Sequence, residues 1–152
     1  MAASTASSRP SDPVRQFSVF MANRLGRLHE LIQRLNAQQV HVLALAVLDT
    51  TDSAIVRIVV DSPDQTRDLL AEHAFAYTES DLLVVEIDSE TRLQEALSAL
   101  VQAEINIHYT YALITRPNGK AALAFNLEDQ ELAAESLRRH QFQILRQGDL
   151  SR

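Results

Sequence analysis

The most promising binding chemistry in this sequence lies in the backbone of one turn. The stretch Ala22-Asn-Arg-Leu-Gly-Arg-Leu28 follows a short apolar run, opens a helical pattern and holds one of only three glycines in the chain. A glycine at such a turn lets the backbone come close to another group, and the first amides of a helix carry partial positive charge. The turn can therefore hold a carboxylate or a phosphate, although an ordinary strand-to-helix connection has the same pattern.

Catalytic and metal-binding patterns are absent from the sequence. The chain contains no GxSxG, Walker or GxGxxG motif, and no two histidines stand at i, i+4 on one predicted helix. Two histidines end equivalent helices, where a cation is stabilised by the helix dipole. We therefore expect no enzyme activity, no metal and no cofactor. The five histidines are His29, His41, His73, His108 and His140.

Composition excludes several further classes of function. The chain of 152 residues is 46% hydrophobic, has no apolar run long enough to span a bilayer and has no cysteine, so we expect a cytoplasmic protein without disulfides or membrane contact. Its net charge of −6 argues against nucleic-acid binding. Tyr109 and Tyr111 share a sheet face, but without a basic pattern around them we expect core or interface packing.

An internal duplication organises the chain. A shift of 65 residues aligns Arg27 with Arg92, and a shift of 67 aligns His73 with His140. The two-residue difference falls in a polar turn, where insertions are tolerated. We predict a flexible N-terminal tail at 1–14, a first unit at 15–80 and a second unit at 81–150.

Hydrophobic periodicity predicts the same six elements in each unit. The first unit has strands at 17–21, 40–48, 54–60 and 75–78, with helices at 25–38 and 63–73. The second has strands at 82–87, 105–115, 121–127 and 142–146, with helices at 90–103 and 130–140. This order is the ferredoxin-like one. We predict an α+β fold in which two ferredoxin-like βαββαβ units with antiparallel sheets pack as an intramolecular pair, since each is small for an independent core.

Two segments on these elements resemble the ACT domain, a small regulatory fold that binds amino acids or similar metabolites. Asn23-Arg-Leu-Gly26-Arg-Leu28 is similar to the family's Asn-x-Pro-Gly-x-Leu loop. Ala103-Glu-Ile-Asn-Ile-His-Tyr-Thr-Tyr-Ala112 is similar to its Ala-Gly-Ile-Asn-Ile signature. The resemblance spans about residues 15 to 150 and implies a tandem ACT-domain protein of the regulatory, amino-acid-binding type.

Each unit keeps one half of the family pattern. Leu25 replaces the usual proline of the first loop, and the second loop, Asp88-Ser-Glu-Thr91, has no glycine and two acids that repel a carboxylate. The first unit has Gln38-Gln-Val-His41 where the family often has Ala-Gly-Ile-Asn. The resemblance therefore implies one composite site that joins the first loop to the second unit.

The composite site would hold both ends of a zwitterion. Amides of the first loop would bind the carboxylate, and Asn106 with neighbouring carbonyls would receive the ammonium group. For Asn106, a local role in satisfying backbone groups at a strand entry stays open. The predicted ligand-binding residues are Asn23, Leu25, Gly26, Arg27, Asn106, Ile107 and His108.

The resemblance implies a protein that senses an amino acid between two ACT units and transmits the signal through association. We expect an amino acid ligand and a homodimer, with a biosynthetic enzyme as a candidate partner. One alternative is a ligand-independent oligomerisation or docking module. Another is a regulatory subunit of an amino-acid biosynthetic enzyme, similar to the small subunit of acetolactate synthase.

Overall fold

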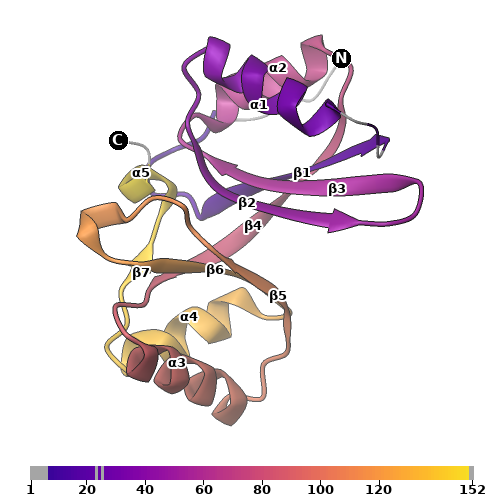
Figure 1. The fold of residues 1–152 in the computed structure, drawn as a ribbon. Helices are drawn as coiled ribbons and strands as arrows, with labels where there is room; N and C mark the ends of the chain where they lie inside the picture. Colours follow the sequence, from indigo (N-terminus) through magenta and orange to yellow (C-terminus); the bar gives the residue numbers. More distant parts are fainter. Residues whose placement is uncertain (1–6, 23, 25, 151–152) are drawn as a thin grey trace.

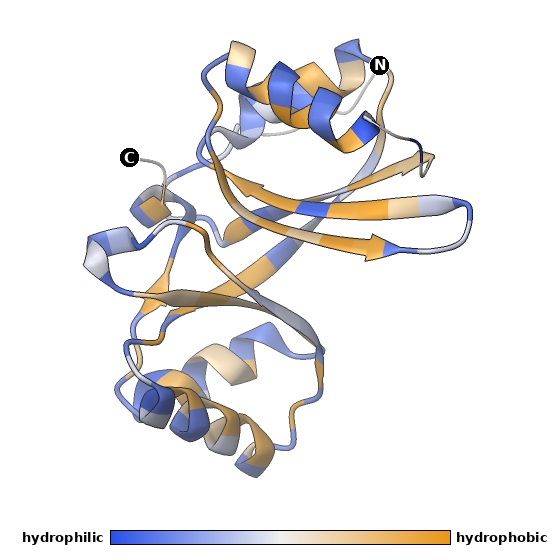
Figure 2. Ribbon diagram, viewed as in Figure 1, coloured by the Kyte–Doolittle hydropathy of each residue, from blue (hydrophilic) through white to orange (hydrophobic). Residues whose placement is uncertain are grey.

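Two sheets face each other, and helices cover the outer face of each. The computed structural model describes residues 7–22, 24 and 26–150. Helices α1 (Arg27–Ala37) and α2 (Pro63–Glu72) cover one sheet, and α3 (Glu90–Gln102) and α4 (Gln130–Arg139) cover the other (Figure 1). Apolar residues concentrate in the strands, while the helices carry hydrophilic residues on part of their surface (Figure 2). This is the layering expected of two ferredoxin-like units in contact.

The first unit is a four-stranded antiparallel sheet in the order β2-β3-β1-β4. Its strands are β1 (Val14–Ala22), β2 (Val42–Asp49), β3 (Ser53–Val60) and the first part of β4 (Ala76–Glu86). Helix α1 begins at Arg27, later than predicted, because Gly26 at its N-cap has a left-handed backbone that does not continue a helix.

The second unit repeats this topology. The rest of β4 lies between β6 (Ala122–Leu127) and the short β7 (Ile144–Leu145), and β6 pairs with β5 (Ile107–Ala112). A 3₁₀ turn, η1 (Pro117–Gly119), precedes β6, and a short helix, α5 (Gln147–Leu150), follows β7. The ladders of β2 and β5 shift register at equivalent places, between Val42 and Ala44 and between Ile107 and Tyr109. The predicted fold class is confirmed.

One strand belongs to both sheets. The strands predicted at 75–78 and 82–87 are a single strand, β4, whose Ala76–Leu82 part pairs with β1 and whose Leu83–Glu86 part pairs with β6. The polar residues at 78–81 resemble a linker in sequence, but they include no glycine or proline that would interrupt a strand. The unit boundary predicted between residues 80 and 81 falls inside this strand.

Three apolar clusters follow from this arrangement. One lies between the first sheet and its helices, around Phe17 and Leu35, and a second lies between the second sheet and its helices, around Phe125 and Leu137. The third lies between the two sheets, and its buried members come from both units. We call this third cluster the inter-sheet core; its buried residues are Val14, Leu43, Ala44, Val59, Leu82, Val84, Leu113, Ala122, Ala124, Leu145 and Leu150.

A buried glutamine joins the two sheets beside the inter-sheet core. Gln16 of β1 is fully buried, and its Nε2 donates to the Tyr109 hydroxyl at 2.7 Å. The Tyr111 hydroxyl donates to Oε1 of Gln16 at 2.6 Å. The guanidinium of Arg57 lies 3.8 Å from the centre of the Tyr109 ring. The tyrosine pair therefore has the interface role expected of it, because it satisfies a buried amide of the other unit.

Removing the hydroxyl of Tyr111 should weaken the inter-sheet contact. Tyr111→Phe leaves Oε1 of Gln16 without that donor, so the free energy of unfolding should fall by about 1–3 kcal/mol. Burial, with a smaller contribution from Tyr109, raises the pKa of Tyr111 above its ordinary value. The pKa is raised in the folded state, so the neutral Tyr111 hydroxyl contributes to the free energy of unfolding. This contribution to stability is complete below pH about 10, the ordinary pKa of tyrosine, and is lost as the pH rises further.

Urea unfolding of the wild type and Tyr111→Phe between neutral pH and pH 11 measures both effects. The variant should be less stable near neutrality and should lose less stability above pH about 10. Tyr77→Phe, on the helix side of the first sheet, is the control. Equal alkaline losses in the wild type and Tyr111→Phe would contradict the assignment.

Candidate functional site

The first loop owes its glycine to backbone conformation. Gly26 has φ 87° and ψ −10°, a region that side chains other than glycine seldom adopt. Among the described residues, and apart from those next to it in sequence, no heavy atom lies within 4 Å of the position that a Cβ would take, so close approach of one of them is not the reason for the glycine. Its carbonyl accepts from the amide of Glu30 at 2.8 Å and so begins helix α1.

A polar pocket of about 440 Å³ opens beside this loop. Within it, Arg27 forms an ion pair with Glu30 and lies 4.6 Å above the centre of the Phe75 ring. The hydrogen bond from Arg27 is the main cause that lowers the pKa of the Glu30 carboxyl. A ligand carboxylate would therefore compete with Glu30 for this guanidinium. The pocket is lined by Arg24, Gly26, Arg27, His29, Glu30 and Gln33.

The second half of the predicted composite site makes contacts within its own unit. The backbone amide of Asn106 donates to Glu128 Oε1 at 3.1 Å, and its side-chain amide donates to Oε2 at 3.4 Å. His108 Nδ1 lies 2.9 Å from the Oδ1 of Asn126. Ile107 is half-buried at the edge of the core of the second unit. These contacts match the local alternative for Asn106.

The two halves do not share the first-loop pocket. The described residues that line it come from the segment 24–33, whereas Asn106 and His108 are bound to neighbours on β6 and just beyond it. Asn23 and Leu25 lie outside the described residues. The composite site therefore stays a prediction.

A larger pocket, of about 480 Å³, lies at the start of α3. It joins the loop before α3, which is the equivalent of the first loop, to the end of β5 and the beginning of β6. Ser89 caps the helix by accepting from the amide of Arg92 at 3.1 Å. We call this the α3 pocket; its lining is Ile87, Asp88, Ser89, Glu90, Leu93, Ala112, Leu113, Ile114, Arg116, Ala121, Ala122 and Leu123.

Arg116 reaches the α3 pocket from the turn that makes the second unit longer than the first. The carbonyl of Arg116 accepts from the amide of Gly119 at 2.9 Å, which closes the turn around Pro117–Gly119. Arg116 is not among the residues that the sequence predicted for the site. The available signal was the two-residue insertion, because insertions in surface turns often carry functional residues.

One wall of the α3 pocket is bonded to the first unit. The amide of Ile114 donates to the carbonyl of Leu43 at 2.7 Å, and Leu113 forms an isolated antiparallel bridge with Ala44. Leu113 and Ala44 are also buried in the inter-sheet core. The pocket thus borders the contact between the two units, and a molecule bound in it would touch residues that maintain this contact.

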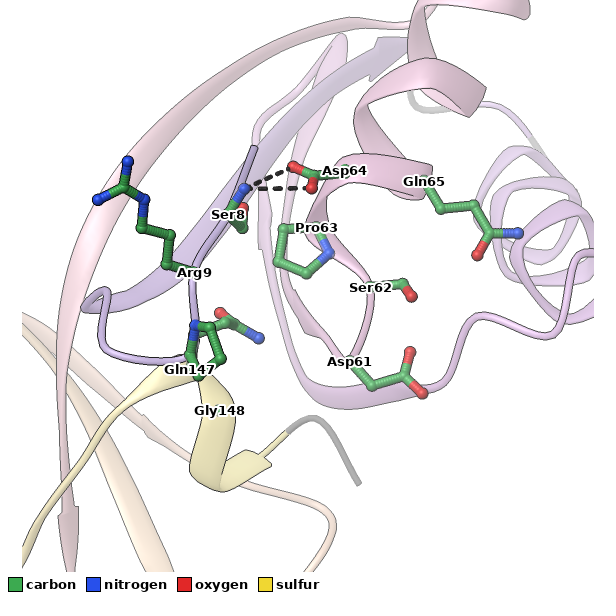
Figure 3. A pocket seen from close by; sticks show the side chains of 10 residues that line it. Ser8, Arg9, Asp61, Ser62, Pro63, Asp64, Gln65, Gln147 and Gly148 are labelled. Carbon is green, nitrogen blue, oxygen red and sulfur yellow. Dashed lines mark hydrogen bonds between the residues drawn. The ribbon is translucent and has the colours of Figure 1, made fainter. Parts of the chain in front are cut away.

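A third pocket, of about 330 Å³, lies where the N-terminal segment meets α2 and α5 (Figure 3). Polar groups of this pocket are hydrogen-bonded within the chain. Ser8 donates its amide to both carboxylate oxygens of Asp64, at 3.1 Å each. Gly148 donates its amide to the carbonyl of Pro10 at 2.9 Å. These contacts join the two ends of the described chain, and we assign the pocket a structural role.

Two of the five histidines lie at the ends of helices. His73 and His140 are the C-cap residues of α2 and α4, and Nδ1 of His140 lies 2.8 Å from the carbonyl oxygen of Ser136. In the part of the chain that the structure describes, no three His, Asp or Glu side chains are grouped to hold a metal ion. No described helix combines the length and the apolar character needed to cross a membrane.

Comparisons with known proteins agree with this architecture. The fold is similar to that of protein BT0572 from Bacteroides thetaiotaomicron, with a TM-score of 0.85 and 23% identity over 95% of this chain and 99% of that chain. It is also similar to the ligand-free regulatory subunit of aspartate kinase from Thermus thermophilus, with a TM-score of 0.59 and 15% identity over 91% and 98% of the two chains. Aspartokinase alpha and beta subunits give a TM-score of 0.55 and 13% identity over 85% and 92%.

At these identities the similar structures show the fold alone. No curated protein matches the sequence at a significant level. The sequence model of the ACT domain pair matches residues 13–152, which include both sheets and all four long helices. The chain therefore belongs to the ACT-domain family, as an ACT domain pair.

Proposed function

We propose that this regulatory ACT pair senses an amino acid in the α3 pocket and transmits binding through the contact between its two units. The observation that carries the proposal is the position of the pocket, because its wall is hydrogen-bonded to the first unit through Ile114 and Leu43. Its volume of about 480 Å³ is within the range of small-molecule sites.

The side chains of the α3 pocket suit a zwitterion with an aliphatic side chain. The guanidinium of Arg116 can pair with a carboxylate, and the exposed carboxylates of Asp88 and Glu90 can accept from an ammonium group. The cation of Arg116 offsets the repulsion that the two acids alone would exert on a carboxylate. Apolar residues, among them Leu93 and Ile114, supply the wall for the rest of the ligand.

Binding would act on the inter-unit contact. A ligand packed against Leu113 and Ile114 stabilises the conformation in which these residues bridge to Ala44 and Leu43. Any population in which this bridge is open then decreases by mass action. The protein would pass this change on through association, with a second copy in a homodimer or with a biosynthetic enzyme in the cytoplasm.

An enzyme partner is the second candidate for the readout. Two structures of similar fold are, by their descriptions, a regulatory subunit of aspartate kinase and subunits of an aspartokinase. A regulatory subunit of an amino-acid biosynthetic enzyme would use the same ligand response. Capture of such an enzyme on the purified chain, strengthened or weakened by the bound amino acid, would support this readout. A ligand response that never alters capture would favour self-association.

Calorimetry against the twenty common amino acids tests the proposed function. At least one with an aliphatic side chain should release or absorb heat and raise the melting temperature. Arg116→Ala should weaken its binding at least tenfold, because the carboxylate loses its cationic partner. Lys120→Ala is the matched control, since it removes a cation from the same turn outside the pocket. No response to any amino acid would contradict the proposal.

Gly26→Val tests whether the ligand binds in the α3 pocket or in the composite site predicted around the first loop. The left-handed φ of 87° makes this change unfavourable by about 1–2 kcal/mol. The new Cβ would have no described heavy atom within 4 Å outside the residues next to it in sequence, so the fold should survive. If the ligand occupies the α3 pocket, Gly26→Val should retain its affinity. Loss of affinity in Gly26→Val, with binding unchanged in Arg116→Ala, would assign the ligand to the first loop instead.

A further inference from the structure

The outer end of the first sheet carries a row of uncovered apolar side chains. Phe20 of β1 is opposite Ile55 of β3, and Ile55 is opposite Leu48 of β2. Residues directly opposite each other in a ladder lie on the same face. Phe20 is 41% exposed and Leu48 47% exposed, and Ile55 is half-buried between them. We call these three residues the open row.

The open row lies on the face of the first sheet that points toward the second unit. Farther along the same strands, this face packs against the second unit. Ile55, Arg57 and Val59 alternate along β3 and so share this face. Val59 is fully buried in the inter-sheet core, and Arg57 stacks on Tyr109 of the second unit. The open row therefore continues an existing sheet-to-sheet interface beyond the point where the second unit ends.

The duplication shows what covers this face in the other unit. The positions equivalent to Leu48 and Ile55 are Leu113 and Ala122, which are 65 and 67 residues later. Leu113 is 9% exposed and Ala122 is 1% exposed, because both are buried in the inter-sheet core against the first unit. Within this chain, the occupant of the equivalent face is thus another sheet of the same fold.

We propose that the open row is a contact between two copies of this chain, with the row of one copy packed on the row of the other about a twofold axis. A twofold axis makes such a patch its own partner, so each apolar side chain is buried in both copies. The row is small for a permanent interface, so the dimer belongs to the weak, concentration-dependent class. This contact supplies the association step of the proposed function and in that respect rests on it.

The neighbouring residue on β2 provides a matched control. Val47 has the same exposure as Leu48, 47%, but it is opposite Val56, whose side chain is in the core on the helix side. Leu48→Asp therefore places a charge on the proposed contact, and Val47→Asp places the same charge on the opposite face of the same edge strand. Both sites are exposed, so both variants should remain folded.

Sedimentation of the full chain over a wide range of concentrations tests the contact. The wild type and Val47→Asp should approach twice the monomer mass at high concentration, and Leu48→Asp should dimerise at least tenfold more weakly. Phe20→Ser should weaken the dimer in the same way, and circular dichroism confirms the fold of each variant. A wild type that stays monomeric, or a Leu48→Asp protein that dimerises as well as the wild type, would overturn the proposal.

Two further outcomes separate alternatives. Equal loss of association in Val47→Asp and Leu48→Asp would indicate edge-to-edge pairing of β2 and would overturn packing of the faces. Amino acid titration of Leu48→Asp distinguishes this inference from the sensing proposal. If Leu48→Asp is monomeric and still releases or absorbs heat with the amino acid, both proposals are supported. If Leu48→Asp breaks the dimer but neither it nor the wild type binds any amino acid, the contact is supported and sensing is contradicted.

Discussion

Strand β4 is the physical constraint on which the rest of the structure depends. Its first part completes the sheet of the first unit beside β1, and its second part lies at the centre of the second sheet beside β6. Because one continuous strand belongs to both sheets, no flexible linker separates the units. The sheets are held face to face, and Val59 of one and Ala124 of the other become fully buried between them. The amide of Gln16 can be buried at this position because Tyr109 and Tyr111 satisfy it from the other unit.

The two units have the same topology but different surfaces on their shared face. Where the first unit has Ala44 and Ala46 on β2, the second has Tyr109 and Tyr111 on β5, and the larger side chains reach across to Gln16. The turn after β5 is longer by two residues than its counterpart and carries Arg116 to the α3 pocket. These differences make the pair asymmetric, so the two loops that precede the first helix of each unit offer different chemistry to a ligand.

Much of the fold could be predicted from the sequence, because helical and alternating apolar patterns depend on local burial. The continuity of β4 could not. Ser80 and its neighbours resemble a polar linker, yet the Ser80 hydroxyl lies 3.2 Å from Nε2 of Gln16 and helps satisfy the buried amide. Such a polar partner can be recognised only when the facing strand is known. The α3 pocket was missed for a similar reason: Arg116 belongs to a turn without periodicity, and its place in the same pocket as Asp88 depends on tertiary structure.

Native-state hydrogen exchange tests the central claim that the shared strand makes the pair one cooperative body. The most protected amides of α1, around Leu31 and Leu35, and of α4, around Leu137, should exchange only through global unfolding, with equal free energies and equal denaturant dependence. These residues lie in separate cores at opposite sides of the molecule, so no shared local contact would produce that agreement. Exchange of either helix through a separate opening of lower free energy would show that the units unfold independently and would contradict the account.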